Sequence, residues 1–155
     1  MNKIIGLFLL VFLISACERR TTRVLSSAMK PTMPKGSLCL IDSSAYKKNS
    51  PRRFDIVAFT PPKPYLQGIW VFRTIGLPKE KIEITNLGVF INGNKLVTPN
   101  NLKYLPLDGV YTKLILRDDE YYLMGDNTKN ANDSRYIGPI KRKMIFGKMI
   151  KILED

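Results

Sequence analysis

The sequence predicts an all-β or predominantly β domain, and three features carry this prediction. Short segments rich in β-branched and aromatic residues alternate with turn-forming residues along most of the chain. The ten prolines and ten glycines are spread along the chain as turn markers. Beyond the N-terminal segment, no window of twelve residues has the 3.6-residue apolar periodicity of an amphipathic helix.

Seven segments are expected to form strands because each is short, apolar or alternating, and bounded by Gly, Pro, Asn or Asp. In chain order they are residues 24–27, 37–41, 55–60, 68–75, 81–85, 88–91 and 121–124. Asn92-Gly93 follows the sixth segment and is the strongest hairpin-turn signal in the chain. The prolines of residues 60–64 predict an extended, exposed loop between the third and fourth strands.

Residues 1–16 have the layout of an export signal, in which a positive charge at Lys3 precedes an apolar run that only Ser15 interrupts. The thirteen residues from 4 to 16 would span about 20 Å as a helix, whereas a bilayer core is about 30 Å thick. The run ends at Ala16-Cys17, which resembles the bacterial lipoprotein signal, where a cysteine is acylated after cleavage. An uncleaved signal anchor is the alternative.

The expected organisation is therefore an export signal at 1–16, a polar tether at 17–23 and one β domain at 24–155. On this interpretation the domain is tethered to a membrane, through the lipid on Cys17 or a signal anchor, and lies on the exported side, periplasmic or extracellular.

The composition excludes several classes of chemistry. The chain has no histidine and two cysteines, so a metal site with nitrogen or sulfur ligands is not expected, and no cofactor is predicted. Lys and Arg number 25 against 13 Asp and Glu, a formal net charge of +12. No recognition helix or basic and aromatic interleaving accompanies this charge, so nucleic-acid binding is not expected. A basic surface near anionic lipid is the simpler interpretation.

Four sequence blocks carry the strongest functional signal. They are SSAMKPTM at 26–33, FDIVAF at 54–59, FRTIGLP at 72–78, and MGDN at 124–127 continuing to DSRYIGP at 133–139. In this order they resemble type I signal peptidases, the membrane-bound endopeptidases that remove export signals with a Ser/Lys dyad. The hairpin at residues 91–93 is also similar. The resemblance covers most of the chain after the tether and implies an antiparallel β-sheet domain.

The resemblance also places the reaction centre of that family on three residues of this chain. The nucleophile position is Ala28, the base position is Phe72, and the position of the serine that supports the base is Ala131. In the family a buried lysine stays neutral because desolvation lowers its pKa, and it then accepts the serine proton. None of these three residues can transfer a proton, so the resemblance implies a catalytically inactive relative.

Other parts of the family pattern are present. Ser26 matches the hydroxyl that helps to stabilise the oxyanion. Two charge pairs are expected from the resemblance, Arg73 with Asp126 and Asp133 with Arg135. The scaffold is therefore expected to fold although the reaction centre is replaced.

The function implied is binding of an extended exported or signal-peptide-like segment, or of an active partner peptidase, beside the first block and the strand that carries residue 72. The resemblance places six residues near that groove: Met29, Pro31, Phe54, Ile56, Val71 and Arg73. A scaffold component that binds partners through another face is a further possibility.

The rival interpretation is an active serine or threonine endopeptidase with a non-standard dyad. Thr32 would be the nucleophile if residues 32–36 imitate the shorter motif of conjugative-transfer peptidases. Ser27 is next to Ala28, but alternation along an extended segment would turn it away from the cleft. Arg73 cannot act as the base because a guanidinium stays protonated in proteins. Cys39 is expected to be a buried, inert thiol.

Overall fold

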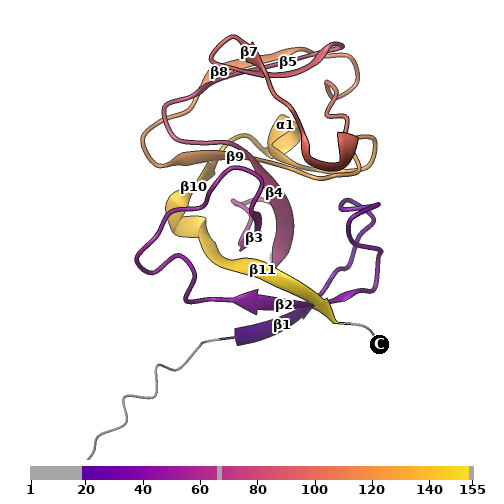
Figure 1. The fold of residues 1–155 in the computed structure, drawn as a ribbon, viewed down its shortest axis with the longest axis vertical. Coiled ribbons are helices and arrows are strands. Elements are labelled where there is room, and N and C mark those ends of the chain that lie inside the picture. The colour runs from indigo at the N-terminus through magenta and orange to yellow at the C-terminus, as the bar shows by residue number, and fades with distance from the viewer. Residues whose placement is uncertain (1–18, 66–67, 154–155) are drawn as a thin grey trace, which may run out of the picture.

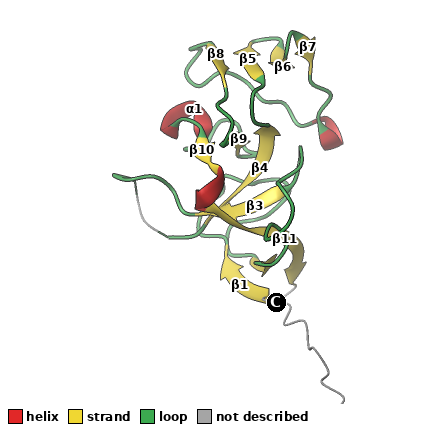
Figure 2. Ribbon diagram, turned by 90° about the vertical axis from the view of Figure 1, so that its left-hand side faces the viewer, coloured by secondary structure: helices red, strands yellow, loops and turns green. Residues whose placement is uncertain are grey.

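The computed structural model describes residues 19–65 and 68–153, which form two antiparallel sheets, one above the other in Figure 1. The larger sheet has the order β1-β2-β11-β3-β4-β9-β10, and the smaller sheet has the order β7-β6-β5-β8. The predicted β class is therefore confirmed. Among the described residues, the only α-helix is the single turn α1, Ser134–Ile137, and short 3-10 turns lie at Pro99–Asn101 and Arg142–Met144 (Figure 2).

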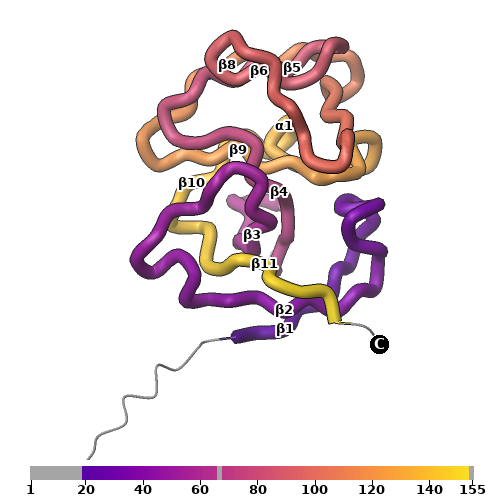
Figure 3. The backbone as a smooth tube through the Cα atoms, viewed as in Figure 1, coloured from indigo at the N-terminus to yellow at the C-terminus, as the bar shows by residue number. Residues whose placement is uncertain are grey.

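The strand bounds follow the chain through the two sheets. The larger sheet contains β1 Arg19–Arg23, β2 Leu38–Asp42, β3 Ile56–Phe59, β4 Trp70–Gly76, β9 Glu120–Met124, β10 Ile140–Lys141 and β11 Ile145–Leu153. The smaller sheet contains β5 Lys81–Thr85, β6 Gly88–Ile91, β7 Asn94–Lys95 and β8 Thr112–Ile115. The tube in Figure 3 shows the chain building the larger sheet first, crossing to the smaller sheet after β4, and returning through β9 to end in β11.

Gly76 lies where β4 leaves the larger sheet, and its missing side chain makes the crossing possible. A β-carbon there would come within 2.6–2.8 Å of Ile82, Leu116 and Tyr122, which belong to the core under the smaller sheet. The larger sheet has its own core, which includes Val57, Phe59 and Phe72. Each sheet is thus held by a separate set of buried apolar side chains, and β4 connects the two.

Six of the seven expected strands form, within a few residues of the expected bounds, and the predicted hairpin is confirmed. Asn92 and Gly93 have φ angles of 50° and 85°, and they join β6 to β7. This pair of positive φ angles is what a tight two-residue turn requires. The loop at 60–64 forms, but it closes in a turn in which Tyr65 N–H donates to the Pro62 carbonyl.

One expected strand was wrong, and the tether prediction needs correction. Residues 24–27 form no strand and bend at 26 and 27, while Arg19–Arg23, expected as part of the tether, pairs with β2 as the antiparallel edge strand β1. The arginines of β1 are exposed, because charged residues are tolerated and even favoured on an open edge. Cys17 and the export signal at 1–16 lie outside the described residues. No helix in the described part of the chain is long and apolar enough to cross a bilayer.

Candidate functional site

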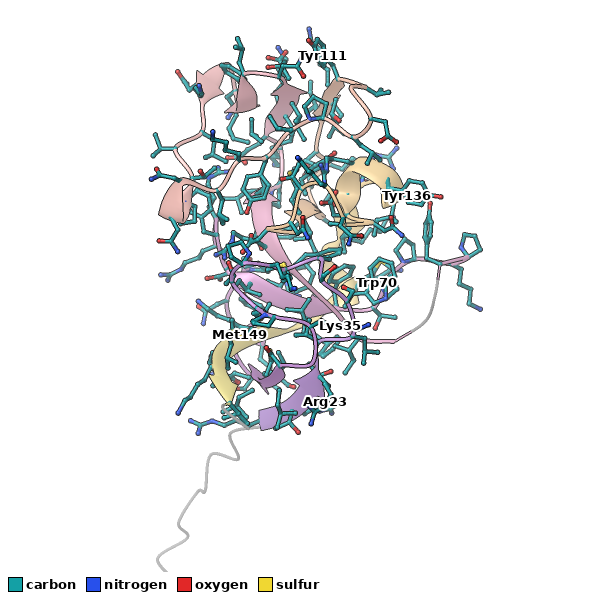
Figure 4. The ribbon with its side chains drawn as sticks, turned by 90° about the vertical axis from the view of Figure 1, so that its right-hand side faces the viewer. Arg23, Lys35, Trp70, Tyr111, Tyr136 and Met149 are labelled. Carbon is teal, nitrogen blue, oxygen red and sulfur yellow. The ribbon has the colours of Figure 1, made fainter. Side chains whose placement is uncertain are left out.

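A cavity of about 320 Å³ lies at one edge of β4. Three segments line it: the chain from Arg23 to Met29, the residues from Gly68 to Phe72, and a loop that contributes Asn130 and Asn132. Figure 4 labels two of the lining residues, Arg23 and Trp70. Most of the wall is apolar, and the polar side chains come from Arg23, Ser26 and the two asparagines.

The edge of β4 that borders the cavity has no strand beside it among the described residues. β4 pairs with β3 from Trp70 to Arg73, but its pairing with β9 begins only at Arg73, opposite Met124. Both backbone groups of Thr74 bond to the β3 side, since its N–H donates to Asp55 and its carbonyl accepts from Phe54. Because the bonding direction alternates along a strand, the N–H and C=O of Val71 point to the other side, into the cavity. The cavity therefore offers an unpaired strand edge.

Ala28, Phe72 and Ala131 come together at this edge. Ala28 and Phe72 both line the cavity and are nearly buried, with 4% and 5% of their surface exposed. Gly125 connects the third residue to them, since a β-carbon on Gly125 would lie 2.5 Å from the β-carbon of Ala131 and 2.6 Å from the carbonyl oxygen of Ala28. The register that pairs Arg73 with Met124 brings Gly125 to the level of Phe72. The centre of the site is therefore apolar, with neither a hydroxyl nor an amine at these three positions.

Ser26 lies at the exposed rim, and its hydroxyl oxygen accepts a hydrogen bond from the Ala28 N–H at 3.3 Å. A hydroxyl and a backbone amide thus stand side by side at the cavity, as an oxyanion-binding arrangement requires. Here the amide donates to the hydroxyl oxygen, so the two groups are bonded to each other.

The loop after Gly125 fixes the chain at Ser27 and Ala28. The Asn127 N–H donates to the Ala28 carbonyl at 2.9 Å, and the Asn127 side-chain amide donates to the Ser27 carbonyl at 3.1 Å. The Ser27 hydroxyl accepts from the Asn130 amide at 2.8 Å and is not among the cavity-lining residues. We expected strand alternation to direct Ser27 away from the cleft. That reason was wrong, because this segment is not a strand. Its hydroxyl nevertheless lies outside the cavity.

Arg73 and Asp126 form a buried ion pair behind the cavity. Arg73 Nη2 lies 2.6 Å from Asp126 Oδ2, and the Tyr104 hydroxyl donates to Oδ1 of the same carboxylate at 2.6 Å. Burial on its own would lower the pKa of Arg73, but the hydrogen bonds and charge of Asp126 raise it overall, so Arg73 stays cationic. Thr32 also donates its hydroxyl proton to Asp126. That hydroxyl is therefore occupied within the ion-pair network and is not directed at the cavity.

Asp133 and Arg135 form the second ion pair, and neither side chain is exposed to solvent. Asp133 caps α1 by accepting from the Arg135 N–H, and it also accepts from the Gly125 N–H at 3.0 Å. Arg135 donates to the Leu105 carbonyl at 2.9 Å. This pair consequently fixes the loop that carries Ala131 and the two asparagines.

The six residues expected along the groove fall into three groups. Met29 and Val71 line the cavity. Pro31 borders a separate, open depression beside Lys30 and Asp126. The remaining three, Phe54, Ile56 and Arg73, are not among the lining residues of either hollow.

Several lining residues were missed by the sequence prediction, notably Ile69 and Trp70. Trp70 is the only tryptophan of the chain, and it follows Gly68 at the start of a predicted strand. That tryptophan occurs once in the chain was the one signal in the sequence that could have drawn attention to Trp70.

Cys39 lies apart from the cavity, in the core of the larger sheet. Its thiol donates to the Met33 sulfur at 3.5 Å, and burial raises its pKa. A raised pKa disfavours the thiolate that would act as a nucleophile. No cluster of three potential metal ligands occurs in the part of the chain that the structure describes.

Fold and site together define a β-sheet protein with an open strand edge in an apolar cleft, an arrangement suited to an extended peptide. The family of signal peptidases, peptidase S26, matches residues 1–153, and this chain belongs to it. The chain is 30% identical over 127 residues to probable signal peptidase I-2 of Synechocystis sp., covering 79% of this chain and 57% of that protein. It is 30% identical over 132 residues to signal peptidase I V of Bacillus subtilis, covering 77% of each chain.

A solved structure shows the same fold. The crystal structure of a signal peptidase I from Enterococcus faecalis superposes with a TM-score of 0.54 at 28% sequence identity, covering 66% of this chain and 98% of the other. The chain spans 57% of the Synechocystis relative and 64% of signal peptidase I from Leptolyngbya laminosa, which is 31% identical to it.

Proposed function

We propose that this chain is a membrane-tethered, catalytically inactive member of the signal peptidase family that binds an extended exported segment, signal-peptide-like in character, or a partner peptidase. The observation that carries the proposal is the coexistence of an intact groove with an inert centre. Val71 offers an unpaired donor and acceptor to a peptide strand, while the adjacent Ala28 and Phe72 can neither attack nor deprotonate anything.

An active endopeptidase with a non-standard dyad is disfavoured by the same geometry. Serine proteolysis needs a hydroxyl and a base at hydrogen-bond distance, both at the bound carbonyl. The Thr32 hydroxyl donates to Asp126, and the Ser27 hydroxyl accepts from Asn130. No lysine is among the residues that line the cavity.

The test combines binding and turnover. The protein in detergent micelles is titrated against a fluorescein-labelled synthetic signal peptide by fluorescence anisotropy, and the same samples are analysed by mass spectrometry for cleavage products. We expect saturable binding and no cleavage. Robust turnover that persists in a Ser27→Ala, Thr32→Ala variant would show that the chain is a peptidase whose nucleophile and base lie elsewhere.

The strand edge can be tested separately. Val71→Pro removes the N–H that faces the cavity without removing a sheet hydrogen bond, because that group has no strand partner. We expect at least about a tenfold loss of peptide affinity, since one net hydrogen bond is worth about 1 kcal/mol and the proline ring also displaces the peptide. Val97→Pro, at an exposed position outside the cavity, is the matched control. Unfolding temperatures of both variants establish that they fold.

A peptide with alternate residues N-methylated tests the same hydrogen bonds from the ligand side, with the protein unchanged. We expect its affinity to fall by a similar factor. Equal affinity of the methylated and unmethylated peptides would exclude strand addition as the binding mode.

A further inference from the structure

Three aromatic rings form one wall of the cavity and the support behind it. The rings of Trp70 and Phe72 meet edge to face with centroids 5.9 Å apart, and both pack on Phe59, at 6.2 and 5.6 Å respectively. Phe59 is fully buried, so it anchors the other two from the core. The wall is therefore rigid before any ligand arrives, and an apolar group placed against it loses little additional entropy.

The aromatic wall faces the side chains that an added strand would direct toward it. Trp70 and Phe72 are two residues apart and project from the same face of β4, on either side of Val71. A peptide strand pairing with the Val71 edge places the residues opposite Trp70 and Phe72 on that same face. One or two alternate side chains of the peptide consequently enter the cavity beside the rings.

The cavity is large for a small side chain. Its volume is about 320 Å³, and the backbone of a peptide strand paired with Val71 takes only part of this space. An alanine methyl group beside that backbone would leave more of the aromatic wall in contact with water than a larger side chain would. A leucine or phenylalanine side chain would displace that water from apolar surface, and each additional buried carbon strengthens binding.

The remaining lining disfavours polar and cationic side chains. The apolar side chains of Val24, Leu25, Met29 and Ile69 also line the cavity and offer no hydrogen bond. Of the polar side chains in the lining, Ser26 already accepts from the Ala28 N–H and Asn130 already donates to the Ser27 hydroxyl. Arg23 is the one charged residue among those that line the cavity, and its positive charge repels a lysine or arginine of the peptide.

We infer that the cavity selects a bulky apolar side chain, of leucine or phenylalanine size, in an extended peptide. The inference rests on the proposed function and adds to it the kind of peptide that is bound. Trp70, Phe72 and Leu25 are then the residues that determine specificity.

The test uses nine-residue peptides that differ only at the central residue, which is alanine, leucine, phenylalanine or asparagine. Asparagine matches leucine in shape and differs in polarity. Binding to the full chain is followed by anisotropy of a labelled peptide and, with unlabelled peptide, by the emission of Trp70, the only tryptophan. We expect leucine and phenylalanine to bind at least about tenfold more tightly than alanine or asparagine. We also expect the Trp70 emission to shift to shorter wavelength with the tight peptides.

A pair of exposed leucines supplies the matched variants. Leu25 lines the cavity with 76% of its surface exposed, and Leu87 lies in the hairpin of the smaller sheet with 72% exposed. Both tolerate a charge without disturbing a core. Leu25→Asp should reduce the preference for leucine over alanine at least threefold, whereas Leu87→Asp should leave it unchanged.

The outcomes separate the inference from the proposed function. Equal binding of all four peptides, or a preference for alanine, overturns the selection of bulky side chains and leaves peptide binding intact. Tight binding of both leucine and asparagine also overturns it, because shape rather than polarity would then decide. Failure of every peptide to bind overturns the proposed function and the inference together.

Discussion

Arg73 and Asp126, 53 residues apart in sequence, join β4 to the loop after β9 through two parallel hydrogen bonds, Nε to Oδ1 at 2.8 Å and Nη2 to Oδ2 at 2.6 Å. The exposed fractions of the two side chains are 9% and 0%. Tyr104, from the connection between β7 and β8, donates to the same carboxylate. One carboxylate therefore holds together segments of both sheets next to the cavity.

This relationship predicts a large loss of stability when Asp126 is removed. Asp126→Ala leaves the Arg73 guanidinium buried without its anion, and we expect the free energy of unfolding to fall by about 3 to 5 kcal/mol. Urea unfolding followed by Trp70 fluorescence measures the change. Asp118→Ala is the control, because Asp118 pairs with Lys79 at the surface with 84% of its side chain exposed, and it should cost less than about 1 kcal/mol. Equal, small losses in both variants would contradict the structural role assigned to Asp126.

The second buried ion pair, Asp133 with Arg135, leads to a similar prediction for stability and adds peptide binding as a second measurement. Asp133 holds Arg135, the start of α1 and the Gly125 N–H. Asp133→Ala should lower the free energy of unfolding by about 3 to 5 kcal/mol. Because this pair fixes the loop that lines the cavity, the variant should also weaken peptide binding at temperatures where it remains folded. Unchanged affinity in the folded variant would show that the loop keeps its position without the pair.

Gly125 should not tolerate a side chain. Its β-carbon would overlap the Ala131 side chain and the Ala28 carbonyl, and the second of these is backbone that cannot rotate away. We expect Gly125→Ala to lower the free energy of unfolding by about 1 to 3 kcal/mol and to reduce peptide affinity, because the Ala28 segment must move.

A double variant separates the effects of the two steric clashes that a side chain at Gly125 would make. Gly125→Ala combined with Ala131→Gly removes the clash with the side chain and leaves the clash with the Ala28 carbonyl. We therefore expect it to regain only part of the lost stability, as measured by urea unfolding. Full recovery would mean that the Ala28 backbone adapts freely.

Strands with regular alternation could be predicted from the sequence, and strands that break the pattern could not. β3 to β6 were predicted correctly because their apolar residues either alternate with polar ones or form short runs bounded by turn residues. β11 was missed because bulges at Ile145/Gly147 and Met149/Lys151 shift its register, so that its apolar residues occur in pairs. β1 was missed because its exposed residues are arginine and threonine, which resemble a linker in composition.

The candidate site divides in the same way. The motif resemblance identified Ala28, Phe72 and Ala131, which the fold does bring together. The cavity wall at Ile69 and Trp70 could not be predicted, because it depends on where the pairing of β4 with β9 begins. That point is set by the register of residues about fifty positions apart, and no local pattern encodes it.

The N-terminal segment carries a prediction of its own. The run that ends at Ala16-Cys17 implies that the mature protein begins with an acylated Cys17 and partitions with membranes. Cys17→Ser should accumulate as an unprocessed precursor, which intact-mass measurement distinguishes from the lipidated form. Cys39→Ser is the control, because Cys39 is buried and should leave processing unchanged. Wild-type protein that retains Met1 and an unmodified Cys17 would exclude the lipoprotein interpretation.

The last prediction concerns Ala28, Phe72 and Ala131, at the positions of the family's reaction centre. If the groove is intact and only the proton-transfer groups are missing, Ala28→Ser, Phe72→Lys and Ala131→Ser together should restore weak cleavage of a fluorogenic signal peptide in detergent micelles. Ala28→Ser alone should fail because the hydroxyl has no base, and Phe72→Lys alone should fail because the amine has no nucleophile to activate. A hydrolase without its nucleophile and base retains only about 10³ to 10⁴ over the water reaction, so the single variants and wild type should all be indistinguishable from background. The replaced Phe72 also removes part of the aromatic wall, so the triple variant should discriminate less between leucine and alanine peptides than wild type does. Peptide binding by the triple variant without any cleavage would show that the Ser26 hydroxyl and the Ala28 amide, bonded to each other at 3.3 Å, do not reorganise around a reacting carbonyl.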